Sequence, residues 1–444
     1  MVLPQAVQYC IQSLEAAGFQ GFAVGGCVRD SLLGLTPSDY DLCTNAKPEE
    51  ICNVFSAHQL LHHGQKHGTV GMLLDGQVYE ITTFRTEGDY TDARHPGWVA
   101  FVPDVESDLA RRDFTVNAMA YNPKLGYIDP FGGQADLRNK ILRTVGDPNA
   151  RFREDALRIL RGARFSARFG LTPESATLAA MEDLAPLMEN LARERVFEEL
   201  CKLLCSSTAK DLLKFVPLLT QIIPELTPSV DFHQHSPHHR YDVFTHTAHV
   251  VEAVPPELSL RWAALLHDIG KPASFTMDET GRGHFKGHAK VSAEMADAIL
   301  LRLKAPSALR QQVTELIGLH MTKLEPDKKL LRRRLGKLGQ ERLEQLLLLQ
   351  EADMGSKGTG KPEEMVQFSV LRGLVQEILT EDACFSIKDL AINGWDLQQA
   401  GFTPGPNIGR CLHWLLGQVQ DEVLPNERKS LLSAAVHVLE DHTQ

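Results

Sequence analysis

Two aspartates that follow a pair of glycines are the residues of this chain best suited to chemistry. Asp39 and Asp41 stand two positions apart in PSDYDLC, and Gly25 and Gly26 precede them in FAVGGCVRD. On one strand, both carboxylates would point to the same face, because side chains alternate along a strand. Carboxylates held that close repel each other unless a divalent cation lies between them. The pair therefore predicts a metal site.

The glycine pair adds a place where a phosphate can bind. The sequence predicts a buried strand at 22–24 and a helix at 28–33. Glycines between them let backbone N–H groups approach a phosphate closely. Together with the two aspartates, this order predicts metal-assisted phosphoryl or nucleotidyl transfer. The alternative is a plain turn followed by a solvated edge strand.

The stretch from Phe22 to Thr44 resembles the nucleotidyltransferase signature of the DNA polymerase β superfamily, and specifically the class II tRNA nucleotidyltransferases and bacterial poly(A) polymerases. The resemblance covers roughly residues 20–210. It implies template-independent addition of C, C and A to the 3′ end of tRNA from CTP and ATP. Asp39 and Asp41 would hold Mg²⁺ and activate the RNA 3′-hydroxyl. The nucleotide would be held by Gly25, Gly26, Arg29, Arg112 and Asp113.

Arg112 and Asp113 belong to a second motif, Arg111-Arg112-Asp113, in a segment (108–121) that is predicted to be helical. Arginine binds triphosphate oxygens in a bidentate way, and aspartate accepts a hydrogen bond from a ribose hydroxyl. The motif resembles the one with which the family contacts the sugar and phosphates of the nucleotide. A salt-bridged helix start is the alternative.

The segment 152–169, FREDALRILRGARFSARF, is predicted to be one helix with an arginine stripe. A solvated helix face is the usual meaning of such a stripe. By resemblance, however, Asp155 and Arg158 match the Glu-Asp-x-x-Arg motif that recognises the base. An Asp acceptor and an Arg donor pair with cytosine and adenine, whereas guanine and uracil would leave polar groups unpaired. Arg161 and Arg164 would then hold phosphates or the neighbouring base edge.

A second group of metal-binding residue types lies between residues 241 and 353. Histidine and carboxylate ligands together favour a transition metal or a mixed site, often with a bridging nucleophilic water. The group resembles the HD phosphohydrolase superfamily, and that resemblance implies the ligands His246, His267, Asp268 and Asp353, with His288 and His320 able to extend the site to two ions. A helical fold with a silent site is the alternative. The preceding histidine-rich stretch 231–242 is predicted to be a solvated linker.

Length and composition set the wider limits. A chain of 444 residues is expected to form two to four domains. The predicted fold is α+β, with a nucleotidyltransferase head containing a mixed sheet at 1–140. All-helical regions follow: a neck at 141–230, an HD domain at 231–360 and a tail at 361–444. Eight scattered cysteines without a Cys-x-x-Cys pair, and the lack of a long apolar run or signal peptide, predict a cytoplasmic protein.

The net charge of −11 argues weakly against a nucleic-acid partner. The segment 143–168, however, contains seven arginines and only three acidic residues, which makes a local basic patch. Three rivals of the same class stay open: a poly(A) polymerase, an enzyme that adds only CC, and one that adds only A. The segment 85–102 is where these enzymes are expected to differ. The rival of another class is an HD phosphohydrolase with a nucleotide-sensing head. A sensor does not need both Asp39 and Asp41, so the pair favours the transferase.

Overall fold

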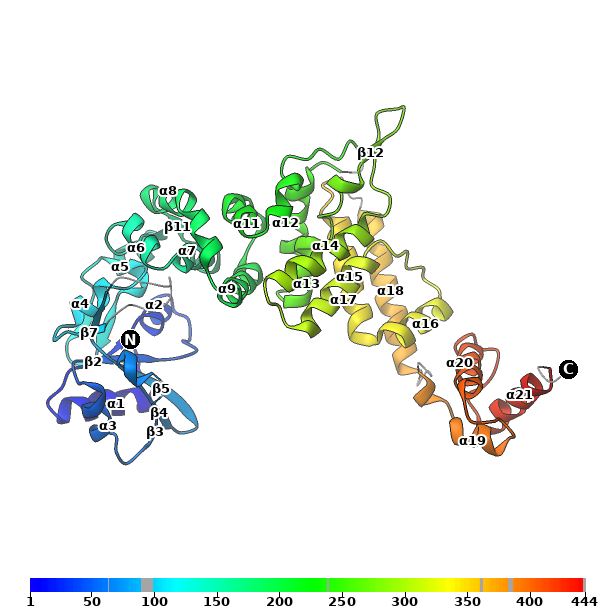
Figure 1. The fold of residues 1–444 in the computed structure, drawn as a ribbon, viewed down its shortest axis with the longest axis horizontal. Coiled ribbons are helices and arrows are strands. Elements are labelled where there is room, and N and C mark those ends of the chain that lie inside the picture. The colour runs from blue at the N-terminus through cyan, green and yellow to red at the C-terminus, as the bar shows by residue number, and fades with distance from the viewer. Residues whose placement is uncertain (63, 89–98, 238, 360–361, 382–385, 442–444) are drawn as a thin grey trace. The chain divides into compact units, whose positions relative to one another are not determined.

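The structure, a computed structural model, describes residues 1–62, 64–88, 99–237, 239–359, 362–381 and 386–441. The chain forms two compact units. One comprises Met1–Pro224 with Arg302–Lys304, and the other Glu225–Leu301 with Ala305–Gln444 (Figure 1). The four predicted domains divide the chain more finely than this and stay predictions. Each unit is described by itself below.

The first unit opens with a head built around a sheet. Its elements are α1 (Gln5–Ala16), β1 (Gly21–Val24), α2 (Gly26–Leu32), β2 (Asp41–Thr44), α3 (Pro48–Val54), β3 (Gln59–Leu61), η1 (Gln65–His67), β4 (Thr69–Leu74), β5 (Gln77–Thr83), β6 (Arg85–Glu87), β7 (Val99–Phe101), α4 (Val105–Ala110), η2 (Thr115–Asn117), β8 (Ala120–Asn122), β9 (Gly126–Ile128), α5 (Gly133–Arg138) and β10 (Ile141–Leu142).

Seven strands form the main sheet, in the order β3-β4-β5-β2-β1-β8-β9. β2 runs parallel to β5, and the other neighbours are antiparallel, so the sheet is mixed, as predicted. Asp75 and Gly76 both have positive φ, the conformation that a tight two-residue hairpin between β4 and β5 requires. A buried apolar core behind the central strands includes Phe22, Cys43 and Phe84.

Two helix predictions for the head are wrong in part. The predicted helix 108–121 ends at Ala110, because the chain beyond it pairs with a distant segment: Phe114 forms an antiparallel bridge with Thr144. The sequence pattern over 47–61, which opens with KPEE, also predicts a helix, but that helix ends at Val54, and β3 follows it and pairs with β4. In both places pairing with another strand overrides the local helical pattern.

The rest of the first unit is almost entirely helical, as predicted. It comprises α6 (Pro148–Glu154), α7 (Leu157–Phe169), β11 (Thr172–Pro173), α8 (Ser175–Asp183), η3 (Ala185–Asn190), α9 (Arg193–Ser206), α10 (Ala209–Lys214) and α11 (Val216–Ile222). The single helix predicted for 152–169 is wrong, because Asp155 adopts an extended conformation (φ −144°, ψ 103°) and separates α6 from α7. Its carboxylate accepts from the backbone N–H of Leu157, the first residue of α7, at 3.0 Å. One of the N–H groups left free at the start of that helix is thereby satisfied.

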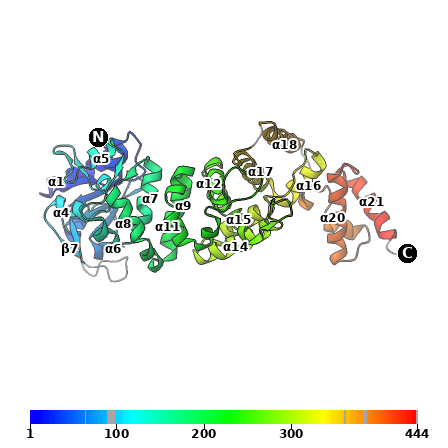
Figure 2. The same cartoon turned by 90° about the horizontal axis from the view of Figure 1, so that it is seen from above.

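Among the residues that the structure describes, the second unit is helical apart from one short hairpin. It comprises η4 (Pro224–Ser229), α12 (Val243–Ala253), α13 (Leu258–Leu266), η5 (Pro272–Ser274), β12 (Thr276–Met277), β13 (Gly283–His284), α14 (His288–Arg302), α15 (Ser307–Leu319), α16 (Lys328–Leu338), α17 (Gln340–Gly355), α18 (Pro362–Thr380), η6 (Ile387–Asp389), α19 (Gly394–Gln399), α20 (Pro406–Gln420) and α21 (Arg428–Asp441). Helices α12, α15 and α17 lie side by side in both views (Figures 1 and 2). The last three helices enclose a small core of their own around Leu397 and Leu415.

Within the described ranges, the structure holds no helix with the length and apolar character that a bilayer crossing needs.

Candidate functional site

Sheet register brings the aspartate pair to the glycine turn. Val24, the last residue of β1, pairs with Asp41, the first residue of β2, so the Asp41 carboxylate lies beside the turn that Gly25 begins. The expectation that Asp39 shares this strand is wrong: β2 begins only at Asp41, and Asp39 lies in the loop before it, where Ser38 Oγ donates to its carboxylate at 2.8 Å. The two carboxylates nevertheless interact.

The pKa of Asp41 reports that interaction. Partial desolvation, and then the negative charges of Asp39 and Glu80, raise the pKa of Asp41, while Arg112 lowers it. Glu80 lies on β5, the parallel neighbour of β2. Negative charge therefore accumulates at this edge, and a divalent cation would relieve it. These carboxylates fit the metal that the sequence predicts.

Arg112 also contacts the glycine turn. A Cβ atom at Gly25 would lie 2.8 Å from its Nη1, so the guanidinium packs directly on the bare backbone of the turn. Nη2 donates to Asp108 at 3.3 Å, while the buried Nε has no hydrogen-bond partner. A buried donor of a charged group without a partner costs free energy, and an anionic ligand at the turn would satisfy it.

The Asp113 carboxylate is fully engaged by protein groups. One oxygen accepts from the backbone of Phe114 (2.8 Å) and from Asn117 Nδ2 (3.0 Å). The other accepts from Arg161 Nε (2.8 Å) and Nη2 (2.7 Å). Burial alone would raise the pKa of Asp113, but Arg161 and Asn117 outweigh burial and hold that pKa well below its usual range. All four acceptor positions of this carboxylate are filled, and its role toward a ribose hydroxyl stays a prediction.

Arg29 is buried against helix α7 of the neck, and its guanidinium is not open to solvent at the glycine turn. It is 5 % exposed, and Nε donates to Asp30 at 2.8 Å while Nη1 donates to Asn117 Oδ1 at 2.5 Å. Its guanidinium lies 4.3 Å from the ring centroid of Phe169 at the end of α7, a cation–π geometry. A triphosphate contact by Arg29 stays a prediction.

Asp155 and Arg158 meet at the break between α6 and α7, and each has partners other than its neighbour. Asp155 accepts from Leu157 N on one oxygen and from Arg195 Nη2 at 2.8 Å on the other. Arg158 donates to Glu154 at 2.5 Å and to the Arg111 carbonyl at 3.2 Å. Two acceptor positions of the Asp155 carboxylate remain for a ligand.

The next two arginines of the stripe serve ion pairs. Arg161 binds Asp113, as described, and Arg164 Nε donates to Glu199 on α9 at 2.6 Å with both side chains almost fully buried. Arg164 also lies 4.1 Å over the ring of Phe165. Contacts of these arginines with phosphates or a base stay predictions.

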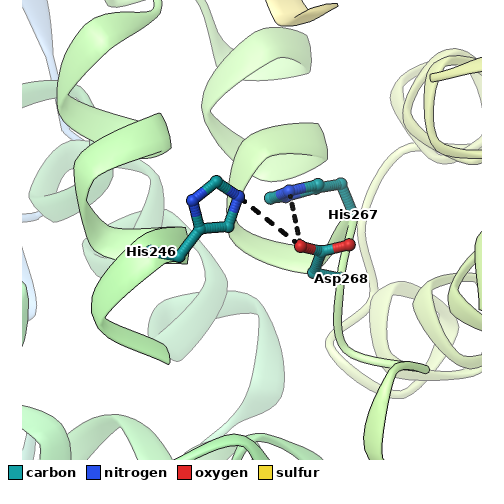
Figure 3. A group of neighbouring side chains, drawn as sticks. All are labelled: His246, His267 and Asp268. Carbon is teal, nitrogen blue, oxygen red and sulfur yellow. Dashed lines mark ion pairs between the residues drawn. The ribbon is translucent and has the colours of Figure 1, made fainter. Parts of the chain in front are cut away.

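In the second unit, the predicted HD residues converge at one place. His246 on α12, and His267 and Asp268 at the end of α13, bring their polar atoms together (Figure 3). His246 Nε2 lies 3.6 Å and His267 Nε2 3.1 Å from Asp268 Oδ2. Asp353 Oδ1 on α17 lies 3.0 Å from His246 Nε2. Four residues from three separate segments of the chain thus form one cluster.

The same aspartate joins a second set of ligands. Asp268 Oδ1 lies 3.3 Å from His288 Nε2 and 3.9 Å from His320 Nε2. Each trio, His246–His267–Asp268 and Asp268–His288–His320, has its ligand atoms within 4.8 Å of one another. Asp268 belongs to both trios, so it would be a ligand of each ion if both trios held one.

All four histidines are oriented in the same way. Their Nδ1 atoms donate to backbone carbonyls, those of Ser356, Ala264, Phe285 and Ile317, at 3.2, 2.8, 2.8 and 2.6 Å. That bond fixes the tautomer in which Nε2 carries a lone pair, which is how metal-ligating histidines are held. His267 Nε2 is buried, and its 3.1 Å contact with Asp268 lacks hydrogen-bond geometry. The residues therefore fit a transition metal.

The pKa shifts of the histidines in this cluster indicate which protons a metal ion would displace. Burial alone lowers the pKa of His267, but Asp268 and Asp353 outweigh burial and raise it. Burial and the charge of His267 lower the pKa of His320 to about 4, so its imidazole is neutral. The protons that balance the buried carboxylates are those that a metal ion displaces when it binds.

Three family models match the chain. They are described as the poly A polymerase head domain, over residues 21–143, the probable RNA and SrmB-binding site of polymerase A, over 170–229, and the putative tRNA nucleotidyltransferase domain 2, over 284–435. Among curated proteins, the CCA-adding enzyme of Levilactobacillus brevis is 35% identical over 425 residues, which is 96% of this chain and 95% of that protein. The chain belongs to the CCA-adding enzyme family. It is a nucleotidyltransferase, as the sequence predicts.

Other CCA-adding enzymes agree with this assignment. The enzyme of Latilactobacillus sakei is 34% identical over 427 residues, 96% of each chain. The crystal structure of the Bacillus stearothermophilus CCA-adding enzyme in complex with CTP superimposes with a TM-score of 0.77 at 27% identity, covering 100% of this chain and 99% of that one. The Thermotoga maritima CCA-adding enzyme, complexed with tRNA, shares the fold at a TM-score of 0.59 and 20% identity, with 99% and 96% covered. As a nucleotidyltransferase of this family, the chain uses a divalent metal ion.

Sequence reasoning missed several residues around these sites. Asn117, Arg195 and Glu199 carry no motif, and only the folded chain brings them to the nucleotide residues. The solvated-linker prediction is wrong for His239, whose ring packs edge-on against His246 at 5.5 Å and whose pKa burial lowers to about 3. Lys271 lies 2.7 Å from Asp268, and the Gly-Lys-Pro that follows the His-Asp doublet was its only signal.

Proposed function

We propose that this chain adds C, C and A in turn to the 3′ end of tRNA, using CTP and ATP and no nucleic-acid template. The observation that carries the proposal is the grouping of Asp39, Asp41 and the unpartnered Arg112 Nε around the Gly25 turn. This grouping supplies both a cation site and an anion site at one sheet edge. The family gives the proposal its substrate, a tRNA end.

Each side chain of the head has a role that follows from its charge. Asp39 and Asp41 hold Mg²⁺ through their carboxylate oxygens. When bound, Mg²⁺ supplies charge neutralisation for the attacking 3′-hydroxyl oxygen and for the phosphate oxygens. The Gly25 N–H already donates to the Met119 carbonyl. Arg112 and the backbone N–H of Gly26 therefore hold the triphosphate at the Gly25 turn, with the Arg112 Nε gaining the partner it lacks.

Base selection follows from Asp155 and Arg158. Arg195 and Glu154 hold these two side chains in place, and the two remaining acceptor positions of Asp155 suit the exocyclic amino group that cytosine and adenine share. Guanine and uracil place a carbonyl oxygen at that position, which would face a carboxylate. CTP and ATP are therefore preferred over GTP and UTP.

The test uses purified protein, Mg²⁺ and three tRNA transcripts that end before CCA, after C and after CC. Each is incubated with labelled CTP, ATP or both, and Asp39→Ala serves as control. We expect the wild-type protein to extend each transcript to CCA and no further. The Asp39→Ala variant should add no nucleotide. Addition of long A tracts would identify the chain as a poly(A) polymerase. Addition of CC alone or of A alone would identify it as an enzyme that carries out only that part of CCA synthesis. No incorporation would refute the proposal.

A second candidate function belongs to the other unit. The convergence of four similarly held histidines on Asp268 favours a metal-dependent phosphohydrolase of the HD type. His246, His267, Asp268 and Asp353 hold a transition metal, with His288 and His320 completing a second site. Lys271 beside Asp268 would add positive charge for a phosphate ester.

This candidate is tested separately from the first. The protein is loaded with Mn²⁺, Fe²⁺ or Ni²⁺, its metal content is determined by elemental analysis, and hydrolysis of bis(p-nitrophenyl) phosphate is followed. Hydrolysis that Asp39→Ala retains and His267→Ala loses would support the candidate. Bound metal without hydrolysis of this ester or of nucleotides would identify a silent site, and a protein that retains no metal would contradict the ligand set.

A further inference from the structure

The side chain of Asn117 connects Arg29, which lies beside the glycine turn, to Asp113 of the second motif. Its backbone belongs to the segment that borders the glycine turn: Gly25 N donates to the Met119 carbonyl at 3.0 Å. Its side-chain oxygen accepts from Arg29 on α2 at 2.5 Å, and its side-chain nitrogen donates to Asp113 at 3.0 Å. The side chain is 6 % exposed, so both bonds are shielded from water.

Asp113 carries the connection on to the neck. Its second oxygen binds Arg161 of α7 through two nitrogens, at 2.8 and 2.7 Å. Arg161 lies one turn after Arg158, which begins the base-selecting end of that helix. An unbroken series of charge-assisted hydrogen bonds thus runs from α2 through Arg29, Asn117 and Asp113 to α7.

Arg29 touches α7 a second time. Its guanidinium lies 4.3 Å from the ring centroid of Phe169 and 5.3 Å from that of Phe165. Helix α7 is therefore joined to α2 at its C-terminal end by ring stacking and at its first turns by Asn117 and Asp113. A rotation of α7 cannot leave α2 and the adjoining Gly25 turn unchanged.

The amide of Asn117 suits this position for a chemical reason. One half accepts from a guanidinium, and the other donates to a carboxylate. Aspartate would keep the first bond but repel Asp113, and an aliphatic residue would leave both charged partners short of a bond. The amide side chain of asparagine satisfies both neighbours at once without adding charge.

We infer that Asn117 is a positioning residue that couples base selection on α7 to the placement of the triphosphate at the Gly25 turn. The inference rests on the proposed nucleotidyl transfer. When the base seats correctly against Asp155 and Arg158, the series of bonds holds α2 and the turn in the arrangement that aligns the α-phosphate. A wrong base tilts α7, and through Arg161, Asp113 and Asn117 it moves the turn out of line.

The experiment measures nucleotide discrimination. Wild type and Asn117→Ala receive a tRNA transcript that lacks CCA, and kcat/KM is determined for CTP and, in separate reactions, for misincorporated ATP. We expect the ratio of the two values to fall about tenfold, or about 1.4 kcal/mol. The CTP rate falls through kcat, while the KM for tRNA is unchanged.

Asn122→Ala is the matched control, because Asn122 is also a buried asparagine of the head. It is 1 % exposed and donates to Glu15 and to the Gly21 carbonyl, outside the series of bonds. Its loss should lower the melting temperature without changing the CTP/ATP ratio. If Asn117→Ala does not fold, Asn117→Asp, which keeps the bond from Arg29, takes its place.

The outcomes separate the inference from the proposed function. A wild type that adds no nucleotide would refute the proposed function itself. A wild type that completes CCA, combined with an Asn117 variant whose CTP and ATP rates fall by the same factor, would overturn the inference and leave Asn117 a structural residue. A variant that loses discrimination as expected, with the control unchanged, supports the coupling.

Discussion

Replacing Gly25 by alanine tests whether the bare backbone of the turn is needed to place Arg112. Gly25 has φ 78° and ψ −123°, a region that is open only to glycine, so an alanine there costs about 1–3 kcal/mol of strain. The new methyl carbon would also lie 2.8 Å from Arg112 Nη1, closer than such atoms approach, so the guanidinium must move. The change therefore affects both stability and the triphosphate contact.

The two effects have different sizes and different assays. The strain should lower the melting temperature by about 2–4 °C per kcal/mol for a unit of this size, measured by calorimetry. A displaced guanidinium loses a hydrogen bond to a charged phosphate, worth about 1.5–3 kcal/mol, which corresponds to a loss of about 10- to 150-fold in kcat/KM for CTP.

Gly34→Ala is the control for backbone strain. Gly34 also has a positive φ, 74°, but no atom lies within 4 Å of its Cβ position. It should therefore lose stability while its kcat/KM for CTP stays within about threefold of wild type. If the Gly25 and Gly34 variants lose the same factor in kcat/KM, Arg112 does not act at the turn and the reasoning is refuted.

Further predictions concern both units. Asp41→Asn should lower nucleotidyl transfer by about a thousandfold without a change in melting temperature, because the metal loses a charged ligand. Arg164→Met should lower the free energy of unfolding by about 3–5 kcal/mol in denaturant titrations, because it leaves the Glu199 carboxylate buried without its main partner. The pKa of Asp113 is lower in the folded protein than in the unfolded chain. Its ionised carboxylate therefore contributes fully to the free energy of unfolding above the unfolded pKa of about 3.9, and this contribution is lost as the pH falls through the folded pKa. The acid-unfolding curves of Asp113→Asn and of wild type should accordingly converge toward low pH. His267→Ala should reduce the metal bound per chain, measured by elemental analysis after dialysis.

Each of these has a result that would contradict it. Asp41→Asn that keeps a tenth of the wild-type rate would remove Asp41 from the metal site. An Arg164→Met protein as stable as wild type would mean that Glu199 finds another partner. Acid-unfolding curves that stay parallel would show that Asp113 does not link stability to pH, and unchanged metal content in His267→Ala would move the ligand set elsewhere.

The chemistry of the head could be predicted because it depends on local pattern. A short apolar strand, two glycines and alternating residues around Asp75-Gly76 determine strand, turn and hairpin within a few residues. The aspartate pair could be named for the same reason, although only Asp41 lies on the strand. The segment 89–98, within the 85–102 stretch expected to separate CCA addition from its rivals, lies outside the described residues.

What the sequence could not supply are the contacts made across long stretches of chain. The residues around Phe114 carry no sequence signal of the bridge to Thr144. Their apolar spacing therefore predicted a helix where the chain pairs with a distant segment instead. The break at Asp155 was hidden because its carboxylate binds the first N–H of α7 and the guanidinium of Arg195, forty residues later. Asn117 gains its importance only from partners in other elements.

The packing of α7 in the first unit has a consequence for how the enzyme responds to heat. Two ion pairs hold this helix: Asp113–Arg161 joins it to the head, and Arg164–Glu199 joins it to α9. The second pair is buried, and in the first the aspartate is buried while the arginine is partly exposed. The hydration of separated charges becomes less favourable on warming, so the cost of keeping such pairs out of water falls as the temperature rises, while apolar burial gains little more. The helix to which we assign base selection should therefore keep these contacts up to the melting temperature, so discrimination between CTP and ATP should persist until the protein unfolds.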